Sequence, residues 1–299
     1  MEEQTMKKIF YISLALLALV SCSKTATETG GGQIRFNMSI GSGATKATAS
    51  EFEDGDAVSL YAVEYDGVTP LPLQIGGNWI NNEKLTFDGI DWSSDRTLYW
   101  PEGACDFYAF YPYQTSIEII DKYPFSVSVD QNSVRTPETL GGYEASDLLW
   151  ASATNVSHGS GTVNLDFHHM MSKVVVRVIK GDKFEGDIPS DIVAHVYNTV
   201  TDCKVDWTNG SVEKDAFGAK RTITMKKISN ERFEAVLVPQ NIEKRTPLIE
   251  LTMGGIAYLL EYSLSFRAGY CHYIDLTLNT SPDQEMIEIS IDAEQGGWN

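Results

Sequence analysis

The chain lacks the marked motifs that most enzymes and metal sites carry. It has four cysteines, no C-x-x-C pair and no cysteine–histidine spacing typical of zinc. It also has no G-x-S-x-G elbow, no P-loop, no H-E-x-x-H pair and no dinucleotide-binding glycine motif after a strand. The sequence therefore predicts no catalysis and no bound metal or cofactor. An enzyme remains the last of three hypotheses for the function. It is kept because the two catalytic carboxylates of a glycosidase are not marked by any short sequence motif.

Basic residues are scarce. Lysine and arginine together number 23 against 41 acidic residues, which gives a net charge of −18. Such acidity argues against nucleic acid and against anionic membrane surfaces as partners, because both repel a negative protein. It is compatible with solubility outside the cell.

The remaining candidate ligands are poorly arranged for metal binding. His168 and His169 are adjacent, so on a strand they point to opposite faces. Three cysteines follow Cys22, and an odd number cannot all form disulfides with one another. We predict that they are small buried residues: Cys105, Cys203 and Cys271. A Cys203–Cys271 disulfide is the alternative in an oxidising compartment. The run Asp54-Gly55-Asp56 lacks the spacing of a calcium loop and predicts a turn.

The chain also has no apolar run long enough to cross a membrane. Its longest run, residues 9–20, follows two lysines and falls short of the ~20 residues that a spanning helix needs. This pattern predicts a signal peptide over 1–21. Leu19-Val20-Ser21-Cys22 resembles the lipobox of bacterial lipoproteins, which implies acylation of Cys22, with palmitate among the fatty acids, and stable anchoring in the outer membrane. Residues 22–32 read as a flexible tether.

Short segments of alternating apolar residues fill the rest of the chain. The first has Ile34, Phe36, Met38 and Ile40 at every second position, which is the period of a half-buried strand. Many such segments separated by turn residues predict an all-β protein, and its length favours two β-sandwich domains, 33–160 and 161–299. Only Glu138–Ala151 suggests a short helix or turn.

Aromatic residues gather in one predicted hairpin. Tyr99-Trp100 and Phe107-Tyr108-Ala109-Phe110-Tyr111 place rings on both of its faces. One face is expected to pack in a core, and the other is expected either to be covered by loops or to form a binding surface.

Several segments, in order, resemble the fimbrillin family, the type V pilins and fimbrillin-like lipoproteins of Bacteroidetes. They are Asp56 with its following strand, Leu98–Pro101, Asp106–Pro112, Ser146–Trp150 and Phe167–Val174. The resemblance implies two transthyretin-like β-sandwich domains in tandem, export as a lipoprotein, and assembly with other pilin subunits into adhesive surface fimbriae. A host or bacterial surface ligand is implied as well. Stalk, tip and anchor subunits are not distinguished.

The two ends of the mature chain share one pattern. Ile287, Ile289, Ile291 and Ala293 alternate within 286–294 as do the four apolar residues of the first strand. The segment 286–294 is therefore a candidate donor strand that fills the groove of a neighbouring subunit after the first strand has been removed. The alternative is that both segments are ordinary edge strands of their own sheets.

Removal of the first strand needs a cleavage site. The resemblance implies cleavage after a basic residue near the N-terminus, and Lys46 lies in the loop-like segment Gly41–Ser50. Refilling four apolar pockets would recover roughly 6–12 kcal/mol before the costs of association. The alternative is a solvated loop lysine in a lipoprotein that is never cut.

Two functions follow. The leading hypothesis is a structural and adhesive subunit of cell-surface fimbriae assembled by strand exchange. The alternative is a non-polymerising surface lipoprotein that binds glycan or protein through exposed aromatics.

Overall fold

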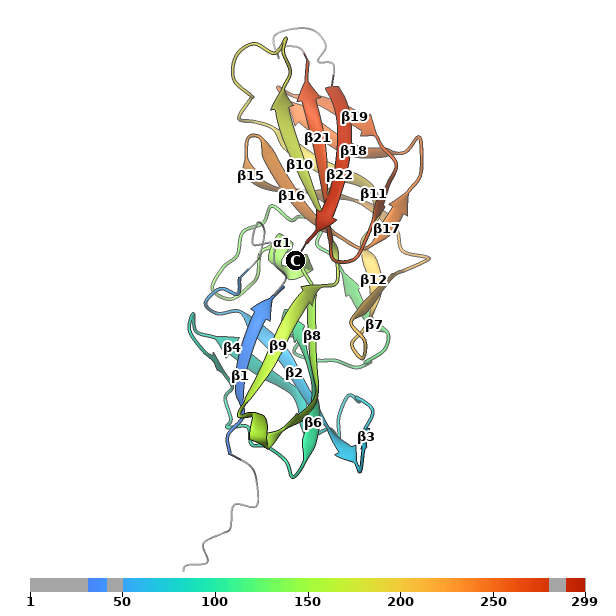
Figure 1. Cartoon of the computed structure of the whole chain (residues 1–299). Coiled ribbons are helices and arrows are strands. Elements are labelled where there is room, and N and C mark those ends of the chain that lie inside the picture. The colour runs from blue at the N-terminus through green and yellow to red at the C-terminus, as the bar shows by residue number, and fades with distance from the viewer. Residues whose placement is uncertain (1–31, 42–50, 280–288, 299) are drawn as a thin grey trace, which may run out of the picture.

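The computed structural model describes residues 32–41, 51–279 and 289–298. Within these ranges the helical elements are α1 (Gly142–Ser146) and a 3-10 turn, η1 (His158–Ser160), and all other regular elements are strands. The predicted all-β class is confirmed, and α1 lies inside the segment expected to hold a short helix. Figure 1 shows an elongated molecule with the early strands at one end and the late strands at the other. Cys22, Lys46 and Ile287 lie outside the described residues.

The first half is one eight-stranded sheet of order β1-β9-β8-β6-β2-β4-β5, with β3 paired to β2. The parallel pair β1–β9 is the exception in an otherwise antiparallel sheet. The sheet curls until its two edges approach each other. The Ile34 N–H, just before edge strand β1, donates to Leu98 O (2.9 Å), which follows the opposite edge strand β5. Its concave face encloses an apolar cluster, the first core. The strands are β1 (Arg35–Ile40), β2 (Ala57–Asp66), β3 (Thr69–Pro70), β4 (Ile80–Phe87), β5 (Trp92–Ser93), β6 (Ala104–Tyr111), β8 (Leu149–Ser157) and β9 (Thr162–His169).

The second half contains a five-stranded sheet, β15-β16-β10-β21-β22, and a four-stranded sheet, β14-β11-β18-β19. Buried residues of both sheets form one cluster, the second core, as expected of a sandwich. The strands are β10 (Ser172–Lys180), β11 (Val193–Val200), β14 (Lys220–Thr224), β15 (Lys226–Ser229), β16 (Arg232–Leu237), β18 (Pro247–Met253), β19 (Ile256–Glu261), β21 (Tyr270–Leu278) and β22 (Ile289–Gly297).

Two smaller sheets complete the fold, and the three-stranded one joins the halves. A three-stranded sheet, β13-β12-β7, pairs β7 (Tyr123–Ser126) from early in the chain with β12 (Asp202–Asp206), and β12 with β13 (Ser211–Lys214). A two-stranded sheet pairs β17 (Gln240–Ile242) with β20 (Leu264–Phe266). The ring of Phe110 on β6 stacks on Trp207, which follows β12, with centroids 4.3 Å apart. The first half therefore contributes residues to the second core.

The domain boundary predicted at residue 160 is misplaced. Strand β9 hydrogen-bonds to β1 and β8, so residues 162–169 complete the first sheet, and the chain enters the second half at β10. Residues 158–161, His-Gly-Ser-Gly, have the composition of a linker but form only the turn between β8 and β9, where Gly161 has φ +69°. A linker and a hairpin turn have the same composition, so sequence alone does not separate them.

The predicted aromatic hairpin does not form, because β6 pairs with β2 and β8 while Tyr99 bridges to Gln33. The rings of β6 are nevertheless covered on both faces of their sheet. Phe107, Ala109 and Tyr111 of β6 enter the first core, while Phe110 enters the second core and Tyr108 packs against it. Of the rings named in the sequence pattern, Tyr99 is the one left half-exposed, at 50 %. The hypothesis of binding through exposed aromatics therefore loses most of its basis in these two segments.

Candidate functional site: the terminal strands and the junction

Strand β1 is held as an edge strand with its apolar residues turned inward. It pairs with β9 from Arg35↔Thr162 to Ile40↔Phe167. Ile34, just before it, is buried, and Phe36, Met38 and Ile40 are half-buried against the first core. The polar residues between them face outward, where the amide of Asn37 donates to Asn164 (3.0 Å) and the hydroxyl of Ser39 donates to Asp166 (3.1 Å). The alternation predicted for this segment is therefore present.

Strand β22 has the same design at the other end of the molecule. It pairs antiparallel with β21 from Ile289↔Leu278 to Gly297↔Tyr270 and forms the edge of the five-stranded sheet. Ile289, Ile291 and Ala293 are half-buried against the second core. In this conformation the C-terminal strand completes its own sheet, which is the alternative kept open above. Its use as a donor would first require it to leave β21.

Trp298 fastens the end of β22. The indole is 1 % exposed and stacks on the imidazole of His169, with centroids 3.8 Å apart and planes 5° from parallel. His169 is the last residue of β9, and its Nδ1 lies 2.8 Å from Asp147 Oδ1. The ammonium of Lys173 lies 5.8 Å from the centre of the indole. The C-terminal strand thus ends against the last residue of the strand that holds β1. Sequence reasoning missed this contact, because a single tryptophan in Gly-Gly-Trp-Asn carries no pattern.

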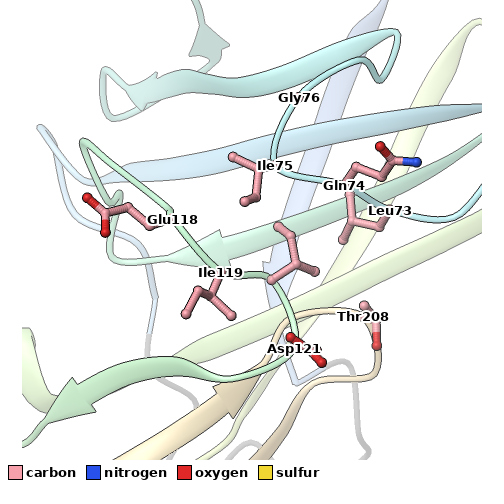
Figure 2. A pocket seen from close by; sticks show the side chains of 9 residues that line it. Leu73, Gln74, Ile75, Gly76, Glu118, Ile119, Asp121 and Thr208 are labelled. Carbon is pink, nitrogen blue, oxygen red and sulfur yellow. The ribbon is translucent and has the colours of Figure 1, made fainter.

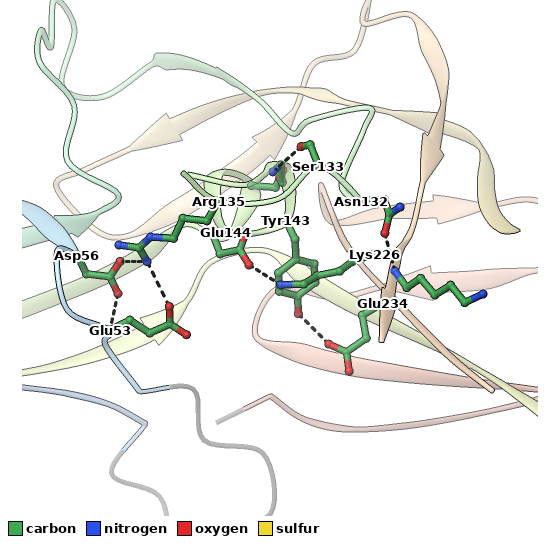
Figure 3. Close-up of polar contacts among 12 residues, drawn as sticks. Glu53, Asp56, Asn132, Ser133, Arg135, Tyr143, Glu144, Lys226 and Glu234 are labelled. Carbon is green, nitrogen blue, oxygen red and sulfur yellow. Dashed lines mark hydrogen bonds and ion pairs between the residues drawn. The ribbon is translucent and has the colours of Figure 1, made fainter. Parts of the chain in front are cut away.

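A buried carboxylate organises the junction next to β1 (Figure 3). Asp56 is 5 % exposed and accepts hydrogen bonds from Arg135 Nη1 (2.8 Å), the Glu53 N–H (2.8 Å) and the Tyr111 hydroxyl (3.3 Å). Gly55 has φ +85°, a left-handed conformation that glycine adopts without strain. The predicted turn at 54–56 is confirmed, and it presents Asp56 to Arg135.

A second set of charged residues lies between the Asp56–Arg135 pair and the second half of the molecule (Figure 3). Together the two sets form the junction. Glu234 pairs with Lys173 (2.8 Å) and Arg232 (2.6 Å) and accepts from the Tyr143 hydroxyl (3.2 Å). Burial raises the pKa of Glu234, but the two cations outweigh burial and leave that pKa below its ordinary value. Burial places the pKa of Tyr143 well above its ordinary value, so Tyr143 remains a neutral donor.

A cavity of about 240 Å³ lies within this junction, with Ile40 at the end of β1 on its wall. Both cations on its wall are paired, Arg135 with Asp56 and Lys226 with Glu144. Paired charges of this kind tie elements together. We therefore assign the junction a structural role.

The other candidate ligands lie apart. The imidazole of His168 packs edge-on against Trp150 (5.2 Å), whereas His169 stacks on Trp298, so the two rings do not converge. Among the described residues, no three His, Cys, Asp or Glu side chains group to hold a metal ion. Cys105, Cys203 and Cys271 are buried and free, as predicted, so Cys203 and Cys271 are not paired.

Stability is expected to fall as the pH drops from about 6.5 to about 4, partly through His272. Burial lowers the pKa of this imidazole to about 4, against an ordinary value of 6.5. Its Nε2 accepts from the Arg267 N–H (3.2 Å), and its Nδ1 has no partner. Between these pH values the unfolded chain binds the proton and the folded chain does not, so acid favours unfolding.

Urea unfolding of wild type and His272→Gln at pH 7.5, 6 and 4.5 measures this contribution. The difference in free energy of unfolding between the two proteins should change in favour of the variant as the pH falls. A difference that is the same at all three pH values would contradict the assignment. Other groups that titrate in this range cancel in the comparison.

No helix in the described ranges is long and apolar enough to span a membrane.

Comparisons with known proteins agree with the fold. The chain is similar to a cell adhesion candidate from Bacteroides ovatus, with 16 % identity, a TM-score of 0.67 and coverage of 90 % of this chain and 98 % of that one. A cell adhesion candidate from Bacteroides uniformis is similar at 19 % identity and a TM-score of 0.63, covering 83 % and 93 %. At these identities the likeness establishes the fold alone.

Two sequence comparisons are more specific. A Bacteroides ovatus protein named for a fimbrium tip subunit, Fim1C, is 24 % identical over 199 residues. The match covers 60 % of this chain and 36 % of that relative, so the chain spans only about a third of the relative's length. The profile of the fimbrillin-like family matches residues 45–295, which include most of the described strands of both halves. The chain is therefore a member of the fimbrillin-like family.

Proposed function

We propose that the protein is a structural and adhesive subunit of cell-surface fimbriae. Membership in the fimbrillin-like family supports a fimbrial role, and the name of the Bacteroides ovatus relative is consistent with it. The family is one of fimbrial and adhesion proteins, so the enzyme hypothesis gains no support. The observation that carries the proposal is the seating of β1, which fills one edge of the first core with alternate apolar side chains.

Assembly proceeds by strand exchange. Because β1 pairs with β9 alone, its departure opens a groove along β9. The departure also breaks the hydrogen bonds that residues 32–34 make to Leu98 and Trp100. The segment 286–294 of the next subunit carries the matching alternation and fills that groove. The donor leaves its own sheet beforehand, which frees β21 and the pocket of Trp298.

Processing at Lys46 is the first test. Lys46→Ala should block cleavage by a lysine-specific surface protease, and the subunit should then remain monomeric. N-terminal sequencing of subunits from isolated fimbriae measures the site directly, and Lys84→Ala is the matched control in a folded strand. Fimbrial subunits that still begin at Cys22 would contradict this route.

The donor is tested by point variants rather than by deletion. Removal of residues 286–299 would take β22 and the buried Trp298 out of the second core, so a deletion would not separate loss of the donor from loss of stability. Ile291→Asn places an amide on the inward face of β22, and Ser290→Asn places the same group on the exposed face. The rate of elongation should fall at least tenfold for Ile291→Asn, because the donor strand loses the binding free energy of one buried apolar side chain. It should stay unchanged for Ser290→Asn. Equal elongation by both variants would exclude β22 as the donor.

Anchoring is a separate part of the proposal. The lipobox-like segment supports acylation of Cys22, an outer-membrane location and display at the cell surface. Cys22→Ala should abolish lipid labelling and move the protein from the detergent phase to the aqueous phase. A Cys22→Ala protein that still carries lipid would overturn this assignment.

A further inference from the structure

We propose that copies of this chain also contact one another away from the terminal strands, with Phe217 of one copy seated in an apolar groove between Ile75 and Ile119 of the next. The interaction joins a basic loop to an acidic-edged groove. It is independent of strand exchange.

The groove lies between the loop that holds Leu73 and Ile75 and the loop that holds Ile119 and Ile120, and Thr208 of the β12–β13 turn also lines it. It is a hollow of about 540 Å³ whose apolar lining is Leu73, Ile75, Ile119 and Ile120. Figure 2 shows Ile75 and Ile119 facing each other across it. Ile75 is 51 % exposed and Ile119 is 44 % exposed, so apolar surface remains open to solvent. Exposed apolar surface gathered in a hollow is typical of an interaction site.

The margin of the groove is acidic. Glu118 and Asp121 line it, and both are exposed. Neither makes an ion pair with any described residue. An occupant that brings a large apolar side chain together with positive charges therefore fits both the lining and the margin.

Phe217 has both properties. Its side chain is 99 % exposed, so it is not seated in any pocket of its own chain. The turn that presents it is well ordered by hydrogen bonds, because Asp215 Oδ1 accepts from the Phe217 N–H (2.9 Å) and Asp215 O accepts from the Gly218 N–H (3.2 Å). An exposed phenyl ring on a backbone ordered in this way is available to enter a pocket of another copy.

The surroundings of Phe217 are the most basic stretch of an acidic protein. Residues 214–227 hold five of the 23 basic residues and a single acidic one. Lys220 and Arg221 are exposed and have no ion-pair partner among the described residues. Copies with a net charge of −18 repel one another in general, so this stretch is where a second copy can approach an acidic margin.

The loop and the groove are different surfaces, so the contact is heterologous and repeats from copy to copy. One phenyl ring and two charge pairs give a weak contact between free subunits. Within a polymer, neighbouring subunits have effective concentrations of about millimolar, at which a weak contact is occupied.

Sedimentation of the full chain carrying Cys22→Ala tests the proposal at concentrations up to about 1 mM. The weight-average mass should rise with concentration, and Phe217→Ala should weaken self-association at least tenfold, the usual effect of truncating an aromatic anchor. Val68→Ala is the matched control, because Val68 is 92 % exposed and lies outside the groove. A mass that stays monomeric throughout, or association that Phe217→Ala leaves unchanged, overturns the proposal.

Charge reversal and cross-linking identify the surfaces. Lys220→Glu with Arg221→Glu should weaken association, and adding Glu118→Lys with Asp121→Lys should restore it. In the Cys22→Ala background the remaining cysteines are buried. Mixing a Phe217→Cys chain with an Ile119→Cys chain should therefore yield a disulfide-linked pair within minutes under mild oxidation. Failure of the second reversal to restore association, or cross-linking no faster than in the mixture of Val68→Cys with Ile119→Cys, counts against the contact.

Discussion

Trp298→Ala is expected to lower the free energy of unfolding by about 3–5 kcal/mol, the usual loss for a fully buried aromatic side chain. The substitution removes the stack on His169 and empties a pocket that is closed to solvent in the wild type. Because the pocket lies where β22 ends, the strand should also fray from β21. Urea unfolding measures the first effect, and amide hydrogen exchange over 289–297 measures the second.

A conservative variant separates ring packing from hydrogen bonding. The Trp298 indole N–H has no partner in the structure, so Trp298→Phe loses part of the ring and no hydrogen bond. It should recover more than half of the loss. Trp79→Ala is the control for an exposed tryptophan, since Trp79 is 41 % exposed. A Trp298→Ala protein as stable as wild type would show that the indole does not hold the C-terminus.

The same contact bears on assembly. His169 ends the strand that pairs with β1, and Trp298 ends the candidate donor strand. After β1 is lost, β9 pairs only with β8, so the position of His169, on which Trp298 stacks, becomes less constrained. A processed subunit is therefore expected to release its C-terminal strand more readily than an unprocessed one. Faster exchange over 289–297 after removal of β1 is the measurable consequence.

The sequence predicts the strands better than their partners. Alternation at Ile34, Phe36, Met38 and Ile40 is visible in the chain because side-chain direction has a period of two. It says nothing about which strand lies alongside, and the parallel pairing of β1 with β9 joins residues 127 apart in sequence. The boundary predicted at residue 160 is misplaced for the same reason. Strand β9 is hydrogen-bonded to β1 in the first sheet, and it is connected to β10 of the second half only because β10 comes next along the chain.

The junction was visible only in part. Asp56 was recognised within a motif, but Arg135 lies 79 residues away in a segment without periodicity. Buried ion pairs depend on tertiary contacts, and a lone arginine in a polar loop reads as solvated. Phe217 is similar: a single phenylalanine between Asp215 and Gly218 gives no indication of whether it is buried or exposed.

Cutting the chain between Lys46 and Ala47 is expected to weaken the first half. Ile34 is fully buried, but Phe36, Met38 and Ile40 are half-buried, so the four side chains contribute roughly 4–8 kcal/mol. This is less than the 6–12 kcal/mol expected when all four are taken as buried. After the cut, β1 is held without a covalent link and can exchange with a competing strand.

A sequence-specific protease site introduced at 46–47 allows the cut to be made on purified protein. Washing in mild denaturant should remove the residues before the cut, and the remaining protein should unfold at lower urea concentration and expose the first core. A fluorescent peptide of residues 287–297 should then bind with one-to-one stoichiometry and raise the unfolding midpoint. The same peptide with the substitutions Ile289→Asn and Ile291→Asn should not bind. Its inward amide groups would be buried in apolar pockets without hydrogen-bond partners, which is unfavourable. A cut and washed protein as stable as the intact one, or binding of both peptides alike, would show that β1 is no removable strand and that the groove along β9 accepts no donor.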